Sequence, residues 1–97
     1  MSDQGARVRS TVYLDESFHG MERFLRDKGW NVEKFKRGVD DDHVADRARS
    51  YGGIVVTGDG QLIDRCRRLK IEVIDVGFAA QLDIVLRYLD SRFPKGG

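Results

Sequence analysis

Acidic residues follow or open apolar segments at three places along the chain. Asp15 ends the stretch "TVYLD", and Asp59 follows the stretch "IVVT", between Gly58 and Gly60. The run "DDD" at 40–42 opens a third apolar-periodic segment. Carboxylates that converge on one place repel each other unless a cation lies among them, and Mg²⁺ or Mn²⁺ is a usual partner of carboxylates and phosphate. The pattern therefore indicates a candidate site for metal-assisted attack on a phosphodiester.

Each acid also has a purely structural explanation. Asp59 precedes a helical pattern, where its side chain can accept backbone N–H groups as an N-cap, and Asp15 or Ser17 can cap the preceding helical pattern in the same way. The acids at 40–42 can complement the dipole of the helix that follows them. Capping explains each acid singly but not the convergence of several, so both interpretations stay open.

The elements that must position these acids alternate between two periods. Strands are predicted over 10–15, 30–36, 54–57 and 71–77, and each is followed by a predicted helix, over 17–29, 42–52, 60–70 and 78–93. The helical stripes predict buried faces made of Phe18, Met21, Phe24 and Leu25; Val44, Ala45, Ala48 and Tyr51; Leu62, Ile63, Cys66 and Leu69; and Leu82, Val85, Leu86 and Leu89.

Strict strand–helix alternation predicts an α/β fold, a single three-layer domain whose four-stranded parallel sheet has helices on both faces. The uninterrupted apolar runs "TVYL" and "IVVT" suit central strands, and the more polar "WNVEKF" and "IEVID" suit edges. The predicted strand order is therefore 2-1-3-4. In such a sheet the ligand site lies beyond the carboxyl ends of the strands where the winding reverses, which places Asp15 and Asp59 at that point.

Composition restricts the class of protein. The 97 residues suit one domain, and 40% hydrophobic with 34% charged residues allow a real core. We expect a domain over 9–93 between flexible tails at 1–8 and 94–97. Net charge is only +1, and the single cysteine, Cys66, cannot form an internal disulfide. With no apolar run long enough to span a bilayer, the expectation is a cytoplasmic protein without membrane association.

Two other classes of protein that use doubly wound sheets, receiver domains and dinucleotide-binding proteins, are disfavoured. Receiver domains of signalling systems carry paired acids after the first strand and a lysine after the last. Here the first place holds only Asp15-Glu16, and the last strand is followed by "GF" at 77–78. No glycine fingerprint follows the first strand, which argues against dinucleotide binding.

The segments "VYLDESF", "DDHVADRA" and "IVVTGDGQLI" together resemble the compact PIN-like nuclease domains, some of which are toxin ribonucleases of toxin–antitoxin pairs. In that family an aspartate ends the first strand, and a second opens a helix seven positions before a small residue. A third aspartate follows a threonine after a buried strand. The resemblance covers roughly 12–76 and implies metal-binding, catalytic roles for Asp15, Asp41 and Asp59.

Neighbouring residues take supporting roles under this resemblance. Thr57 matches the family threonine, and Ser17 and Thr57 are expected to hydrogen-bond the acids and fix their orientation, as Glu16 also does unless it is only a helix-start acid. Two positions differ from the family pattern, because Gly58 replaces a polar or basic residue and Gln61 stands where larger members carry a fourth acid. Candidates for a further acid are Asp42, Asp64 and Asp75.

The basic run "RCRRLK" provides candidate RNA contacts. Arg65, Arg67 and Arg68 are expected to bind RNA phosphates, although a solvated helix face is the ordinary explanation of such residues. The last predicted helix carries an extended apolar stripe for so small a sheet, so part of it is expected to pair with a second subunit in a homodimer.

The resemblance implies a metal-dependent endoribonuclease that uses Mg²⁺ or Mn²⁺ to cleave RNA, in the setting of RNA processing or of a toxin with an antitoxin protein. The alternative is a catalytically inactive PIN-like scaffold that binds RNA or a partner protein, since a fold can persist after its chemistry is lost.

Overall fold

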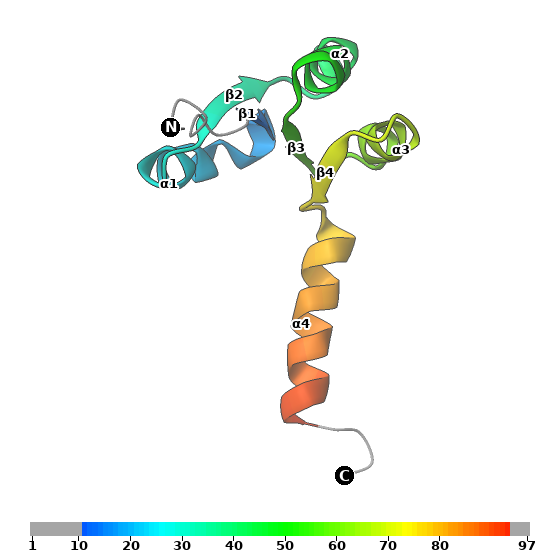
Figure 1. Cartoon of the computed structure of the whole chain (residues 1–97). Coiled ribbons are helices and arrows are strands. Elements are labelled where there is room, and N and C mark those ends of the chain that lie inside the picture. Colours follow the sequence, from blue (N-terminus) through cyan, green and yellow to red (C-terminus); the bar gives the residue numbers. More distant parts are fainter. Residues whose placement is uncertain (1–10, 94–97) are drawn as a thin grey trace, which may run out of the picture.

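The computed structural model describes residues 11–93 (Figure 1). The predicted tails at 1–8 and 94–97 lie outside the described residues. Four parallel strands form one sheet in the order β2-β1-β3-β4, as predicted, and the strands are β1 (Thr11–Asp15), β2 (Asn31–Phe35), β3 (Ile54–Thr57) and β4 (Glu72–Asp75). The described chain is therefore an α/β domain with an all-parallel sheet.

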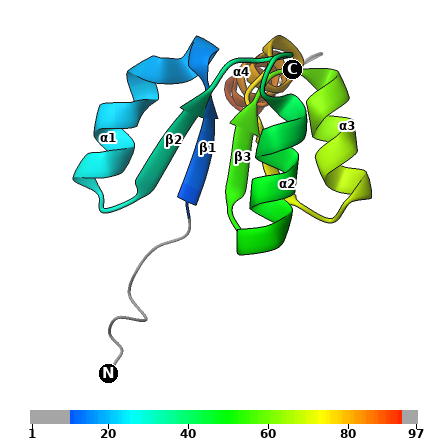
Figure 2. The same ribbon diagram turned by 90° about the horizontal axis from the view of Figure 1, so that it is seen from above.

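Helical segments follow every strand. They are a 3-10 helix η2 (Glu16–Met21), then α1 (Glu22–Asp27), α2 (Asp41–Tyr51), α3 (Gly60–Arg68) and α4 (Phe78–Arg92). Figures 1 and 2 show α1 on one side of the sheet and α2 with α3 on the other, so that helices cover both faces. Right-handed crossovers on opposite faces are what the reversal of winding between β1 and β3 requires.

Side chains of the strands alternate between two cores. On the side of α2 and α3, Tyr13 and Val55 pack with buried residues of those helices, among them Ala45, Leu62 and Cys66. On the side of α1 the buried cluster is smaller and consists of Val12, Leu14, Val32 and Val56, with Phe18, Leu25, Trp30 and Val76 packed against it. The burial of both faces of β1 explains why its sequence is apolar without interruption.

The single helix predicted over 17–29 is wrong in detail, because the structure divides it into η2 and α1. Phe18 has non-helical dihedrals (φ −117°, ψ 27°), and the capping turn at Asp15 draws the chain into a 3-10 geometry. Gly20 within this stretch disfavours a regular α-helix. Of the predicted apolar stripe, Met21 and Phe24 are exposed rather than buried.

Two further predictions of burial are wrong. Tyr51 is exposed; it is the last residue of α2, and its ring lies beside the guanidinium of Arg47. The stripe Leu82, Val85, Leu86 and Leu89 is exposed as a whole, whereas only part of it was expected to lie outside the core of the chain. Figure 1 shows the reason, since α4 runs away from the sheet instead of folding back onto it, and none of its residues is buried.

Among residues 11–93, no helix is both long enough and apolar enough to cross a membrane.

Candidate functional site

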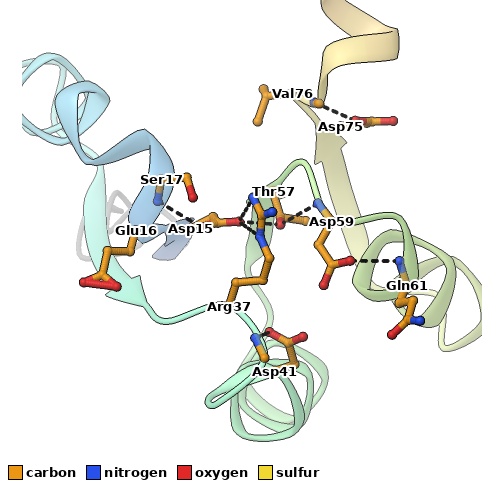
Figure 3. Close-up of polar contacts among 12 residues, drawn as sticks. Asp15, Glu16, Ser17, Arg37, Asp41, Thr57, Asp59, Gln61, Asp75 and Val76 are labelled. Carbon is orange, nitrogen blue, oxygen red and sulfur yellow. Dashed lines mark hydrogen bonds and ion pairs between the residues drawn. The ribbon is translucent and has the colours of Figure 1, made fainter.

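Asp15 is a fully buried carboxylate at the carboxyl end of a central strand. Figure 3 shows the groups that surround it. The backbone N–H of Ser17 donates to its Oδ1 at 2.9 Å, and the hydroxyl of Thr57 donates to Oδ2 at 2.8 Å. The guanidinium of Arg37 reaches the same Oδ2 through Nε and through a terminal nitrogen, both at 2.8 Å. Every contact therefore comes from a donor, which suits an ionised carboxylate.

Two opposing effects, burial and contacts with donor groups, set the pKa of Asp15. Burial raises it, because a charged group loses its hydration. The hydrogen bonds from Ser17, Thr57 and Arg37 and the positive charge of Arg37 outweigh burial, so the pKa of Asp15 lies below its ordinary value of 3.8. Asp15 is therefore a buried anion throughout the physiological range, with one cationic partner among the described residues that contact it.

Arg37 is the site residue that the sequence reasoning missed. It lies in the loop between β2 and α2, and its side chain is 42% exposed although that of Asp15 is 1% exposed. A short loop between an edge strand and a helix gave no signal for an arginine that points inward. The usable clue was a buried acid without an assigned counter-ion, because such a charge requires a cation.

Thr57 connects two of the predicted acids. Its hydroxyl donates to Asp15 and accepts the backbone N–H of Asp59 at 3.1 Å. Asp59 in turn caps α3, since its Oδ1 accepts the backbone N–H of Gln61 at 3.2 Å. The capping interpretation of Asp59 is therefore confirmed, as is the hydrogen bond predicted between Thr57 and an acid. In Figure 3 the side chains of Asp15, Asp41 and Asp59 are arranged around Arg37.

The three acids at 40–42 have different environments. Asp40 accepts the backbone N–H of Lys36 at 2.9 Å, and Asp41 accepts that of Gly38 at 3.0 Å, so both shape the loop that carries Arg37. Asp42 is exposed and forms an ion pair with Arg65. Asp41 is half-buried and lines an open hollow with Gln61, Leu62, Asp64, Arg65 and Arg68. Asp15 and Arg37 line a different hollow, of which Asp41 is not part.

The remaining supporting acids point elsewhere. Glu16 is exposed and begins η2, and Figure 3 shows its carboxylate pointing away from Asp15. Asp75 uses its Oδ1 to accept the backbone N–H of Gly77 at 2.8 Å, in the turn between β4 and α4. Ser17 contacts Asp15 through its backbone N–H, so its serine hydroxyl is not the group that orients the carboxylate.

Gly58 and Gly77 bring two loops into backbone contact beside the site. A Cβ placed on Gly58 would lie 2.9 Å from the Cα of Gly77, and one on Gly77 would lie 3.0 Å from the carbonyl oxygen of Gly58. The backbone N–H of Val76 also donates to the carbonyl of Thr57 at 3.0 Å. The glycine that departs from the family pattern therefore has a packing reason in this chain.

The arrangement of the described acids argues against a divalent cation at this site, whereas the chemistry of their oxygens favours one. Within the described residues 11–93, no group of three or more His, Cys, Asp or Glu side chains is placed to hold a metal ion. The group that Arg37 contacts is nevertheless the carboxylate of Asp15, which is buried and ionised. Carboxylate oxygens are the ligands that Mg²⁺ and Mn²⁺ prefer. The partly exposed guanidinium of Arg37 supplies the positive charge beside Asp15.

Comparison with family models, with curated proteins and with solved structures found no match for the chain.

Proposed function

We propose that the chain is a metal-dependent endoribonuclease of the PIN-like type. The observation that carries the proposal is the buried, ionised Asp15, whose cationic partner Arg37 reaches it from a partly exposed loop. Folding a carboxylate into the carboxyl edge of a sheet is costly for stability alone, and such acids cluster at functional sites. The position lies where an open α/β sheet binds its ligands.

Asp15, Asp41 and Asp59 would hold Mg²⁺ or Mn²⁺ in this proposal. The bound ion would supply Lewis acidity for hydrolysis of an RNA phosphodiester. The hydroxyl of Thr57 keeps Oδ2 of Asp15 in position, and the backbone N–H of Ser17 holds Oδ1. Arg67 and Arg68 are exposed on α3, the helix that Asp59 caps, where they can hold the negatively charged backbone of the substrate.

The cellular setting that we propose is the cytoplasm, with RNA as substrate and with an antitoxin protein and a second copy of the chain as partners. Expression of the active form from an inducible promoter would arrest growth, and a variant without the acid site would not. If the wild-type protein, expressed at the same level as the variant, did not slow growth, the toxin role would be excluded. The nuclease proposal would not be affected, because it is tested separately.

The nuclease proposal is tested by comparing the wild-type protein with Asp59→Asn on structured RNA in Mg²⁺, Mn²⁺ and EDTA. Asparagine is as good an N-cap as aspartate, so the fold is retained while the negative charge is lost. We expect cleavage by the wild-type protein with either metal, none in EDTA, and a loss of at least about 100-fold in Asp59→Asn. Asp83→Asn, which changes an exposed acid of α4, is the matched control. Cleavage that survives EDTA or the Asp59 change would exclude the metal site.

A second candidate is a non-catalytic scaffold that binds RNA or protein. It is favoured by one observation, namely that Arg37 neutralises Asp15 while the described acids do not form a metal-holding group. Metal-independent RNA binding without cleavage, equal in the wild-type protein and in Asp59→Asn, would support the scaffold over the nuclease.

A further inference from the structure

Helix α4 presents an apolar stripe that nothing in the described chain covers. The side chains of this stripe recur at helical spacing and are between 43% and 79% exposed. They belong to Phe78, Leu82, Val85, Leu86, Leu89 and, directly after the helix, Phe93. Asp83 and Arg87 lie on the opposite side of the helix together with Ile84, which is also exposed. An amphipathic helix with a continuous apolar stripe normally packs that stripe against another surface.

The sheet has a matching uncovered region on the side of α1. Strand alternation places Ile54 of β3 and Ile74 of β4 on that side, since Val55 and Val73 belong to the core on the other side. Val56 faces the same side but is already buried in the smaller cluster. Figure 1 shows α1 over β2 and β1, not over β4. Ile74 is accordingly 49% exposed. A helix is missing from this half of the layer.

The turn between β4 and α4 holds the helix away from its own sheet. The backbone N–H of Val76 donates to Thr57, and that of Gly77 donates to the side chain of Asp75. The side chain of Gln81 in the first turn of α4 donates to the carbonyl of Val76 at 2.7 Å. With Gly77 packed on Gly58, the direction of α4 is fixed at several points. Folding α4 back onto its own sheet would break the contact of Gln81, the one of these residues that lies within the helix.

We propose that α4 packs on the open β3–β4 face of a second copy of the chain, and that the second copy returns the same contact. Each copy then supplies the helix that the other lacks, and the exchange closes into a two-fold dimer without leaving an unpaired surface. Ile74 of one copy meets the stripe of α4 from the other. The exchange does not depend on the nuclease proposal, because it uses none of the site residues.

The available area is sufficient for such a dimer. Large aliphatic side chains present on the order of 100 Å² each, so at about half exposure two stripes of this size remove on the order of 600 Å² from water. The covered sheet faces lose a similar area, which brings the total to about 1,200 Å², the lower end of stable interfaces. A membrane surface is a poorer occupant, because the polar side of α4 carries aspartates as well as arginines rather than a cationic face.

The mass of the protein is the first test. Sedimentation over a range of concentrations is expected to give a dimer for the wild-type protein, and Leu89→Glu is expected to raise the dissociation constant at least about 100-fold by placing a charge in the contact. Ser91→Glu adds the same charge on the opposite side of α4 and should leave the constant within about threefold. Circular dichroism checks that both variants are folded. A wild-type monomer at all concentrations would overturn the proposal.

A cysteine pair then tests the exchange itself. Ile74→Cys protein is mixed with Val85→Cys protein under oxidising conditions, and the native Cys66 is buried and does not interfere. Exchange predicts a mixed disulfide-linked dimer at least about fivefold more abundant than either self-linked product. A Val85–Val85 product alone would indicate that two α4 helices pair with each other, and efficient intrachain linkage in the double variant would indicate that α4 folds back. Either result would refute the exchange.

Discussion

The hydroxyl of Thr57 donates a 2.8 Å hydrogen bond to Oδ2 of Asp15 and thereby joins the carboxyl ends of the two central strands. Both side chains are fully buried, although 42 positions separate them in the chain. The same hydroxyl accepts the backbone N–H of Asp59. Thr57 is therefore a positioning residue for two acids at once.

The first prediction concerns that hydroxyl. Thr57→Val keeps the shape of the side chain but leaves the buried Asp15 and the N–H of Asp59 each without one partner, so we expect a loss of about 1–3 kcal/mol in the free energy of unfolding. Thr57→Ser retains the hydroxyl and should recover most of the loss. Urea unfolding at neutral pH measures both variants. Equal stability of the valine and wild-type proteins would show that the hydrogen bond contributes nothing.

Most of the framework around this contact could be predicted from the sequence. The uninterrupted apolar stretches before Asp15 and Asp59 indicated central strands, and the order β2-β1-β3-β4 followed because parallel strands buried on both faces cannot lie at an edge. Strand order decides which chain segments meet at the carboxyl edge, so the proximity of Thr57 to Asp15 was accessible as well.

The remaining features depend on contacts that periodicity does not encode. The sequence did not decide how much of the α4 stripe belongs to the core, since the pattern of Leu82 and Leu89 is the same whether the covering surface belongs to the same chain or to another. The inward position of Arg37 depends on the loop geometry set by Asp40 and Asp41. The need for Gly58 arises from a second loop 19 residues away, at Gly77.

The second prediction concerns Gly58. Gly58→Ala would place a methyl group against the backbone of Gly77, which cannot move without breaking the β4–α4 turn, so we expect a loss of roughly 1–3 kcal/mol. Gly60→Ala is the matched control, because a Cβ there meets nothing within 4 Å and its φ is not positive. Thermal unfolding of both variants is the measurement. The loss of backbone entropy in the unfolded chain stabilises both variants slightly, so a destabilisation of equal size in the two would show that the Gly77 contact is not responsible.

The third prediction is the pH dependence of stability. The pKa of Asp15 is lowered in the folded protein, so the unfolded chain takes up the proton first, and the stabilisation is complete above the ordinary value of 3.8. It is lost as pH falls through the lower, folded value. The difference in unfolding free energy between the wild-type protein and Asp15→Asn should therefore be constant from pH 5 to 7 and shrink below about 4.

Urea titrations at a series of pH values measure this difference. Asp83→Asn, an exposed acid paired with Arg87 on α4, provides the control for nonspecific acid effects. A difference that grew as pH fell below 4 would contradict the assignment of Asp15 as a buried anion.

The fourth prediction concerns RNA. The guanidinium of Arg65 is engaged by Asp42, whereas Arg67 and Arg68 are exposed on α3. The double change Arg67→Ala and Arg68→Ala should weaken single-stranded RNA binding at every sequence and reduce the slope of log affinity against log salt by about 1.4, which corresponds to two phosphate contacts. Arg65→Ala should have a smaller effect. Fluorescence anisotropy at several salt concentrations measures this, with Arg87→Ala as the control. An unchanged salt slope would remove α3 from the RNA surface.

The last prediction separates a cation site from a structural ion pair. Arg37→Met removes the guanidinium from Asp15 while keeping a long side chain, so the buried carboxylate loses its counter-ion and the metal-free protein should lose about 1–3 kcal/mol of stability. If the acids form a cation site, the same change removes a competing cation, and Mn²⁺ should bind at least about fivefold more tightly.

The free energy of unfolding separates the two effects, because the loss of the ion pair lowers it and the binding of Mn²⁺ raises it. Added Mn²⁺ should raise the unfolding free energy of Arg37→Met more than that of the wild-type protein, since a ligand that binds only the folded state stabilises it according to its affinity. Arg47→Met removes the ion pair with Glu33 at the edge of the sheet and should show no gain from Mn²⁺. Loss of stability without any gain in Mn²⁺ affinity would identify Arg37 as the permanent partner of Asp15 and would favour the scaffold over the nuclease.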